Sequence, residues 1–139
     1  MTDTGLLILR VFAGLFMAFG HGLGKFNRFF SGEEIKFMDF LGIGMKASLF
    51  LAMSAEFFFA LFIVLGLFTR FSSIFLIVTM FVAAFIAHGG DPFGKMEMSL
   101  LYLTIFTTLF FTGGGKYSVS NLFASKFENG NKIISFLVK

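Results

Sequence analysis

Four apolar stretches run through the chain, and their length limits what it can fold into. An α-helix needs about 20 residues to cross the hydrocarbon core of a bilayer, which is about 30 Å thick. The second and third stretches have this length by themselves, and the first and fourth reach it with their polar flanks. We therefore predict an all-α membrane protein with four transmembrane helices, spanning about residues 5–24, 47–68, 71–88 and 96–113.

The composition agrees with a chain whose main partner is the lipid bilayer. Apolar residues make up 57% of the 139 residues and charged residues only 14%, whereas a soluble domain carries about 25% charged residues. The basic residues are scattered or terminal and form no stripe, so nucleic acid is not an expected partner. The chain contains no cysteine, so any redox activity needs a cofactor or a partner protein.

The links between the predicted spans indicate how the helices are arranged. Spans two, three and four are joined by short links, so we expect them to be antiparallel neighbours in one bundle. Residues 26–46 mix charges with Phe, Ile and Leu, which favours an interfacial helix along the lipid head groups after the first span. Residues 119–139 form an amphipathic tail that we also expect on the membrane surface, which leaves residues 1–118 as the transmembrane domain.

Four spans place both termini on one side of the membrane. Each side then carries five Lys or Arg residues, so the positive-inside rule gives a tie by count. The side opposite the termini also carries five acids, against two on the side of the termini. Acids contribute little to orientation, so this difference gives only a preference for cytoplasmic termini.

Two ionisable residues, Arg10 and Glu56, fall inside the predicted spans. Each such residue costs roughly 2.5–3.5 kcal/mol on insertion scales and is therefore a functional candidate. Eleven residues separate Arg10 from His21, about 1100° of helix, so both side chains are predicted on one side of the first span. In depth, His21 lies about 5 Å from Glu56 and Arg10 about 11 Å. His21 is thus the nearer candidate partner. Arg10 could instead extend to the membrane face of the termini or bind loop carbonyl oxygens, although its long side chain also allows a pair with Glu56.

Small residues accompany Glu56 at every fourth position, namely Ser48, Ala52 and Ala60. Such a row lets a neighbouring helix approach closely, so Glu56 is predicted to face protein. A structural ion pair is the simpler alternative to a functional role for a buried acid. Thr104 and Thr108 likewise fit ordinary helix packing, because threonine can bond its own backbone.

The side opposite the termini collects most of the remaining polar candidates. His21 and His88 end their spans there and could simply be interfacial. Lys25, Asp91 and Glu97 lie at the same level. These residue types include metal ligands. Their separations in the sequence do not match the close spacing of a metal-binding motif, so no metal is predicted.

Several short motifs together resemble the DoxX family of small four-helix membrane proteins. They cover about residues 5–120 and are Leu7 to Arg10, His21-Gly22 with Lys25, Ala55-Glu56, Gly66 to Arg70, His88, and Gly115 to Ser118. By this resemblance, the family's recurrent polar positions correspond to His21, Lys25, Glu56, Arg70 and His88. After Ser118 the chain departs from the family pattern, in which an Asp commonly follows; Val119, Ser120 and Asn121 stand here instead.

The resemblance implies a bacterial inner (plasma) membrane and a link to redox chemistry. The family takes its name from a subunit of a thiosulfate to quinone oxidoreductase, and some members are described as partners of thiol-redox and oxidative-stress proteins. The leading hypothesis is a redox-associated subunit that binds a quinone head group and handles its protons, because imidazole and carboxylate groups supply both functions. The catalytic candidates are His21, Glu56 and His88, and the substrate-binding candidates are Arg10, His21, Lys25, Glu56, Arg70, His88 and Glu97.

Two other classes of function remain open from the sequence. A small transporter or proton-coupled permease would use Glu56 and Arg10 as coupling residues. Because the sequence has no inverted repeat, this reading requires a homo-oligomer. A non-catalytic assembly or cargo-binding membrane protein would use the same residues only as structural ties.

Overall fold

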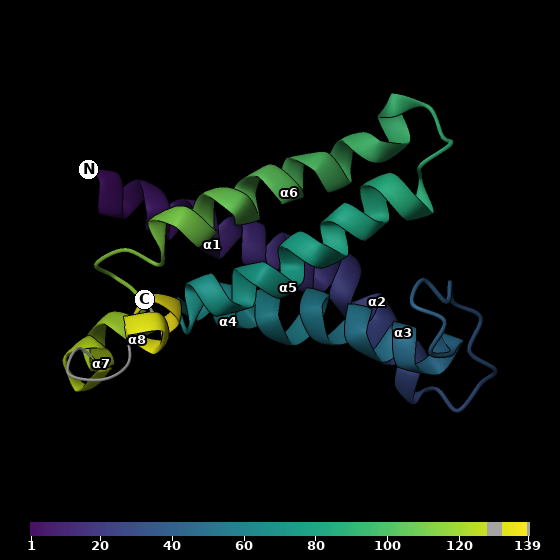
Figure 1. The fold of residues 1–139 in the computed structure, drawn as a ribbon, viewed down its shortest axis with the longest axis horizontal. Helices are drawn as coiled ribbons and strands as arrows, with labels where there is room; N and C mark the ends of the chain where they lie inside the picture. The colour runs from purple at the N-terminus through teal and green to yellow at the C-terminus, as the bar shows by residue number, and fades with distance from the viewer. Residues whose placement is uncertain (128–131, 139) are drawn as a thin grey trace.

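The computed structural model describes residues 1–127 and 132–138, and every regular element in this part of the chain is a helix (Figure 1). Short π-helical turns, labelled η, lie within two of the long helices without breaking them (η1 and η2) and form the end of a third (η3). The elements are α1 (Thr2–Met17), η1 (Ala18–Gly22), α2 (Leu23–Phe30), α3 (Met45–Met53), η2 (Ser54–Phe59), α4 (Ala60–Leu65), α5 (Thr69–Val82), η3 (Ala83–Ala87), α6 (Phe93–Thr112), α7 (Val119–Phe127) and α8 (Lys132–Val138).

Three continuous helices in the described part of the chain are long and apolar enough to cross a membrane. They are Thr2–Phe30, Met45–Leu65 and Thr69–Ala87. The second and third agree with the predicted spans to within a few residues, whereas the first continues beyond its predicted end to Phe30. The fourth predicted span corresponds to α6, a 20-residue helix that is not among these three.

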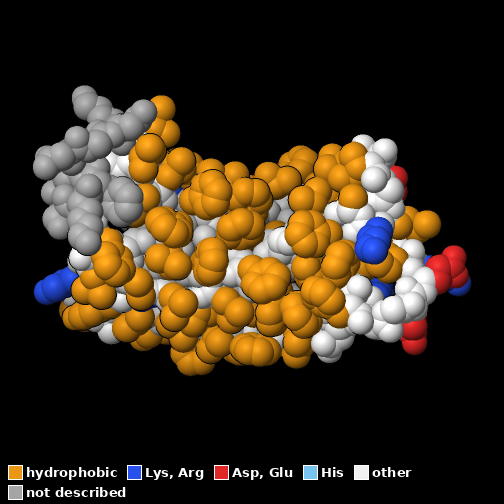
Figure 2. All heavy atoms as spheres, turned by 90° about the horizontal axis from the view of Figure 1, so that it is seen from below, with side chains coloured by type: hydrophobic (Ala, Val, Ile, Leu, Met, Phe, Trp, Pro, Cys, Tyr) orange, Lys and Arg blue, Asp and Glu red, His pale blue; other side chains and the backbone are white. Residues whose placement is uncertain are grey.

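The outer surface carries the side chains expected of a membrane protein. Figure 2 shows hydrophobic side chains over the middle of one face and charged side chains toward its two ends. Large apolar residues such as Phe12, Phe16, Phe81 and Phe85 are exposed. A band of this kind is unfavourable in water and suits hydrocarbon between two polar boundaries.

The core lies where α1, α4, α5 and α6 meet. α5 and α6 run side by side and are joined at one end by residues 88–92 (Figure 1). Side chains from all four helices and from η1 fill the space between them, so each helix buries one face. The central cluster consists of Met17, Ala18, Ala60, Ile63, Leu76, Met80, Tyr102, Phe106 and Leu109.

Two glycines let the first helix approach the second. A Cβ atom on Gly22 would lie 2.4 Å from the carbonyl oxygen of Glu56, and one on Gly14 would lie 2.8 Å from that of Ala60. The small-residue row around Glu56 therefore meets glycines across the interface, and its members Ser48, Ala52, Glu56 and Ala60 are all buried. This confirms that Glu56 faces protein.

The predicted position of His21 is wrong, because η1 changes the helical phase. A π-turn holds one residue more than an α-turn, so residues after Ala18 are rotated by about 100° relative to a continuous α-helix. Gly22 is therefore the residue that continues the buried side of Arg10 and Met17, and His21 is exposed.

The predicted interfacial helix over residues 26–46 is also wrong in its secondary structure. The first helix extends to Phe30, and residues 31–44 form an irregular loop. Gly32, Gly42 and Gly44 have φ values of 76°, 67° and 100°, which a right-handed helix does not allow. Asp39 also accepts local backbone N–H groups, a bonding pattern that competes with helix formation.

The predicted C-terminal tail corresponds to α7 and α8, with residues 128–131 and 139 outside the described part of the chain. Arg70 connects this region to the bundle. Its guanidinium group donates to the carbonyl oxygens of Phe110 and Phe111 at the end of α6, and to that of Phe136 in α8. The Phe136 ring also lies 4.2 Å from the guanidinium carbon.

Candidate functional site

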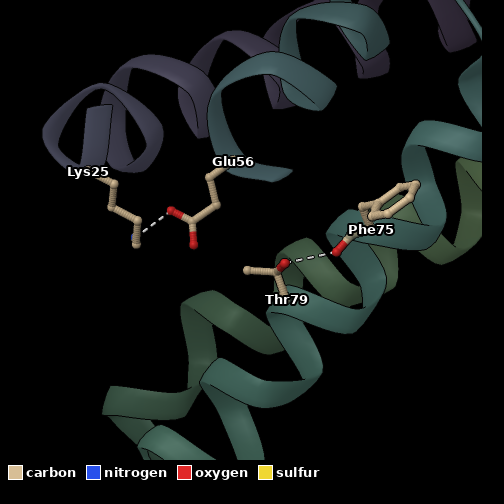
Figure 3. A network of polar contacts seen from close by, with 4 residues as sticks. All are labelled: Lys25, Glu56, Phe75 and Thr79. Carbon is tan, nitrogen blue, oxygen red and sulfur yellow. Dashed lines mark hydrogen bonds and ion pairs between the residues drawn. The ribbon is translucent and has the colours of Figure 1, made fainter. Parts of the chain in front are cut away.

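A cavity of about 260 Å³ lies between α2, η2 and α5, and the loop after α2 covers it. Its walls are mostly apolar, and its polar side chains come from residues far apart in the sequence. Figure 3 shows Lys25 and Glu56 meeting in the space between the helices, with Thr79 projecting toward them from α5. The lining consists of Lys25, Phe37, Met38, Phe40, Ala52, Glu56, Thr79, Val82, Ala83, Ala87 and His88.

The central feature of the site is an ion pair between Lys25 and Glu56. The Lys25 Nζ atom donates to Glu56 Oε2 at 2.5 Å. Glu56 is 4% exposed, and 23% of the Lys25 side chain is exposed. Charge-assisted hydrogen bonds are stronger than neutral ones, and this one balances a carboxylate that the apolar surroundings would otherwise destabilise.

The two π-turns bring this pair together. η1 places Gly22 directly against the backbone of Glu56. One turn after Gly22, Lys25 therefore lies on the side of the helix that faces η2. His21 contacts α6 instead, where its ring meets that of Tyr102 edge-on at a centroid distance of 5.8 Å. The structure thus gives Glu56 a different partner from the predicted one.

Asp39 fixes the loop that covers the cavity. Its carboxylate accepts the backbone N–H groups of Ile43 at 3.0 Å and Gly44 at 2.9 Å, and the Ser48 hydroxyl at 3.1 Å. Phe37, Met38 and Phe40, on either side of Asp39, line the cavity. Partial desolvation raises the pKa of Asp39, but the hydrogen bonds from Gly44, Ser48 and Ile43 outweigh it and hold that pKa below its usual value.

Because these hydrogen bonds need a charged Asp39 carboxylate, we expect the loop to lose stability in acid. The pKa of Asp39 is lower in the folded loop than its ordinary value of about 3.9. Above that ordinary value, the charged carboxylate stabilises the loop fully. This stabilisation is lost as the pH falls through the lowered pKa of the folded state. We expect the amides of Ile43 and Gly44 to be protected from hydrogen exchange at neutral pH and to lose protection below about pH 3.9. Exchange measured by mass spectrometry, corrected for the intrinsic effect of pH, tests this.

The Asp39→Ala variant provides the matching control for that experiment. It should lack the protection at every pH, because its side chain cannot accept these hydrogen bonds. Equal protection of Ile43 and Gly44 in the variant and the wild type at neutral pH would show that Asp39 does not hold the loop.

His88 lies at the rim of the cavity and forms a second polar chain. Its Nδ1 atom lies 2.9 Å from Asp91 Oδ2, and Asp91 Oδ1 lies 3.6 Å from the Nζ atom of Lys95, which is mostly exposed. The hydrogen bond from His88 and the charge of Lys95 lower the pKa of Asp91, although partial desolvation raises it. These three residues connect the cavity rim to the protein surface.

Arg10 lies away from Glu56 and binds backbone oxygens. Its guanidinium group donates to the carbonyl oxygens of Ile63 and Val64 in the last turn of α4, and to that of Tyr117 at 2.7 Å. Val64 lies in the last turn of α4, where a helix leaves carbonyl groups without partners of its own. Of the three arrangements that the sequence allowed for Arg10, the structure therefore has the one with carbonyl ligands.

The other candidates do not line the cavity. Arg70 binds the end of α6, as described above, and Glu97 is exposed in the first turns of the same helix. Thr104 and Thr108 donate to carbonyl oxygens one turn earlier in α6, as expected for helix packing. The structure thus groups Lys25, Glu56 and His88 and separates them from Arg10, His21, Arg70 and Glu97.

Sequence reasoning missed Asp39, which holds the loop over this site, and Tyr102, which contacts His21 outside it. Asp39 was assigned only to the interfacial segment. The sequence did carry a signal for a turn, because Asp39 precedes Gly42 and Gly44 shortly before a helix. Tyr102 was also missed, although it is one of only two tyrosines in the chain. Among the described residues, no group of three or more His, Asp and Glu side chains could hold a metal ion.

Apolar helices of membrane-spanning length, with a buried ion pair between two of them, define an integral membrane protein. The family model described as DoxX matches residues 5–89, and the chain therefore belongs to the DoxX family. The match includes Lys25, Glu56 and His88. No curated protein and no solved structure matches the chain.

Proposed function

We propose that this protein is a redox-associated membrane subunit that binds a quinone head group in the cavity between α2, η2 and α5. The observation that carries the proposal is the convergence of Lys25, Glu56 and His88 on one apolar cavity. At about 260 Å³, the cavity is slightly smaller than a typical site for a drug-sized ligand, about 300–1,000 Å³. Its size therefore suits a single substituted ring.

The polar side chains match the chemistry of a quinone ring. Reduction of a quinone to a quinol takes up two electrons and two protons. The ammonium group of Lys25 and the imidazole of His88 can donate hydrogen bonds to the ring oxygens, and Glu56 can hold a proton for transfer. The electrons would come from a partner redox protein with a flavin or dithiol centre, because this chain has no thiol of its own.

A proton route to water would run through the rim of the cavity. His88 bonds Asp91 at 2.9 Å, and Asp91 is paired in turn with the mostly exposed Lys95. Histidine exchanges protons readily near neutral pH. This chain of side chains supports a path from bulk water to the ring without passing through the bilayer.

The architecture that we propose is a four-span antiparallel bundle in a bacterial inner membrane, with α6 as the fourth span. α6 has 20 residues, a length of about 30 Å, which equals the hydrocarbon thickness. It buries Tyr102, Phe106 and Leu109 against the other helices. Its first turns contain Lys95 and Glu97, which lower its hydropathy and fit a position at the membrane boundary. Redox partner proteins or a second copy of the chain could bind at its outer surface.

This architecture predicts which residues a membrane-impermeant reagent reaches. The chain has no cysteine, so single cysteines can be introduced without background. With cytoplasmic termini, Lys116→Cys should react with an impermeant maleimide only after cells are opened, and Glu34→Cys should react in intact cells. The reverse pattern would invert the orientation, and labelling of both residues from the same side would contradict the four-span arrangement.

The proposal predicts that quinone binding depends on the cavity residues. The probe is a dimethoxy-methyl-benzoquinone without a tail. Glu56→Gln removes a charge-assisted hydrogen bond and should weaken its binding by roughly 10-fold or more. His88→Gln should weaken its binding by roughly 5- to 10-fold. Calorimetric titration of the purified protein measures both effects. His88→Gln leaves the buried ion pair intact, so its effect does not depend on a change in folding.

Glu97→Gln is the matched control, because it makes the same substitution at an exposed position outside the cavity. Its affinity for the quinone should equal that of the wild type. Unchanged binding in Glu56→Gln and His88→Gln, or no binding in any protein, would contradict the proposed function.

A further inference from the structure

The polar contacts of the loop over the cavity lie within the loop and at its two ends. The loop comprises residues 31–44, and Figure 1 shows it at the end of the bundle opposite the chain termini. Within the described part of the chain, its hydrogen bonds and ion pairs are made inside the loop or to Arg28 and Ser48 beside it. None of them joins the loop to η2, α5 or η3, although these elements form the cavity walls.

Apolar side chains are therefore what holds the loop over the cavity. Phe37, Met38 and Phe40 line the cavity from the side of the loop, and none of the three is fully buried. A segment with few buried apolar contacts opens at a much smaller free-energy cost than global unfolding. We thus expect this cover to open while the helices behind it stay packed.

Glycines at both ends of the loop can serve as hinges. Gly32 follows the end of α2, and Gly42 and Gly44 precede α3, with φ values of 76°, 67° and 100°. A Cβ atom added to any of the three would meet nothing within 4 Å, so neighbouring atoms leave the backbone free to turn there. Hinges are a few loop positions that absorb a change in φ and ψ, and glycine opposes such a change least.

Asp39 keeps the loop in its closed position. Its carboxylate binds the backbone of Ile43 and Gly44 and the hydroxyl of Ser48, and so connects the middle of the loop to the first turn of α3. Phe40, whose side chain lines the cavity, is the next residue in the chain. The placement of the apolar cover thus depends on one carboxylate.

The closed loop separates a buried ion pair from water. Behind it, Glu56 is 4% exposed and Ala52 is 6% exposed, and Lys25 is paired with Glu56. The loop itself carries the exposed charges Glu34 and Lys36, which belong in water and not in hydrocarbon. Movement of the loop away from the helices would therefore open the cavity to water.

We propose that residues 31–44 form a lid that turns about Gly32, Gly42 and Gly44 and opens the cavity to water, with Asp39 as the residue that keeps it closed. The inference goes beyond the proposed function, because it concerns how any ligand or proton in water reaches Lys25 and Glu56. It requires no particular ligand, so its test needs none.

A cysteine placed behind the loop tests the lid, because the chain has no cysteine of its own. Ala52→Cys puts a thiol in the cavity wall. In the detergent-solubilised protein, a charged methanethiosulfonate reaches this thiol through water, and mass spectrometry measures the rate of modification. Asp39→Ala in this background should raise the rate by about 10-fold or more, because three hydrogen bonds to a charged group are lost. Asp39→Asn keeps an oxygen acceptor and should raise it less.

A second variant and two controls complete the experiment. Phe40→Ala leaves the Asp39 carboxylate in place and removes one ring of the cover, so it should raise the rate by about 5-fold. Glu34→Ala removes an exposed charge of the same loop and should leave the rate unchanged. Ser73→Cys reports unfolding, since Ser73 lies on α5, is 0% exposed and does not line the cavity. Its thiol should stay unreactive in every loop variant.

Two results would overturn the lid. One is an unchanged rate at Ala52→Cys in both Asp39→Ala and Phe40→Ala. The other is a parallel increase at Ser73→Cys, because the reagent would then enter by unfolding of the bundle and not by movement of the loop. Neither result involves quinone, so failure of the lid leaves the proposed function untouched, and absence of quinone binding leaves the lid untouched.

Discussion

Replacing Gly22 by alanine should lower the free energy of unfolding by about 2 kcal/mol or more, although alanine is the better helix former. The added Cβ would lie 2.4 Å from the Glu56 carbonyl oxygen, 2.6 Å from its carbon and 2.7 Å from the Phe57 nitrogen. All three are backbone atoms, so the contact can be relieved only if the helices separate. Titration of the detergent-solubilised protein with SDS measures the loss.

Gly20 and Gly24 provide matched controls on the same helix. A Cβ added to either residue meets nothing within 4 Å, so alanine should be neutral or should stabilise the helix by up to about 1 kcal/mol. We therefore expect a difference of about 2–3 kcal/mol between Gly22→Ala and its controls. Equal stability of the three variants would show that the first and second helices are not packed as described.

Replacing Lys25 by methionine should cost about 3 kcal/mol. Removal of one partner from a buried ion pair costs about 3–5 kcal/mol because the other charge is left uncompensated. The lower end applies because 23% of the Lys25 side chain is exposed. Adding Glu56→Gln to Lys25→Met should recover part of the loss, and a double-mutant cycle on the four proteins measures the coupling.

The exposed pair of Lys36 and Glu34 is the control for this experiment. Its charged atoms are 4.0 Å apart, with 84% and 83% of the side chains exposed, so Lys36→Met should have no measurable effect on stability. If Lys25→Met and Lys36→Met behave alike, the contact between Lys25 and Glu56 does not stabilise the fold.

The membrane-spanning helices could be predicted from the sequence because hydropathy is a local property. The prediction of Met45–Leu65 and Thr69–Ala87 required only the length and composition of each segment. The burial of Glu56 also followed from its own helix, since every fourth residue around it is small. These predictions did not depend on how the helices pack against one another.

The partner of Glu56 could not be predicted, because it depends on a π-turn formed within the packed helix. A regular α-helix would place His21 on the side of Arg10, and the extra residue in η1 replaces it there with Gly22. The close contact between Gly22 and Glu56 involves two segments that are distant in sequence. A signal was nevertheless present, because His21-Gly22 and Lys25 belong to the family pattern together.

The loop over the cavity was mispredicted for a different reason. Its Phe, Ile and Leu residues suggested an amphipathic helix, but Gly32, Gly42 and Gly44 and the side chain of Asp39 favour turns. The apolar residues Phe37 and Phe40 line the cavity. Composition alone does not distinguish a loop that covers a cavity from a helix on the membrane surface.

The most direct test of the quinone site is to identify the small molecules that copurify with the protein. Wild-type, Glu56→Gln and Glu97→Gln proteins would be purified in mild detergent in parallel, extracted with solvent and analysed by mass spectrometry. We expect quinone to be retained by the wild type and by Glu97→Gln and to be clearly reduced in Glu56→Gln. Equal amounts in all three proteins, or none in any of them, would contradict a quinone site at Lys25, Glu56 and His88.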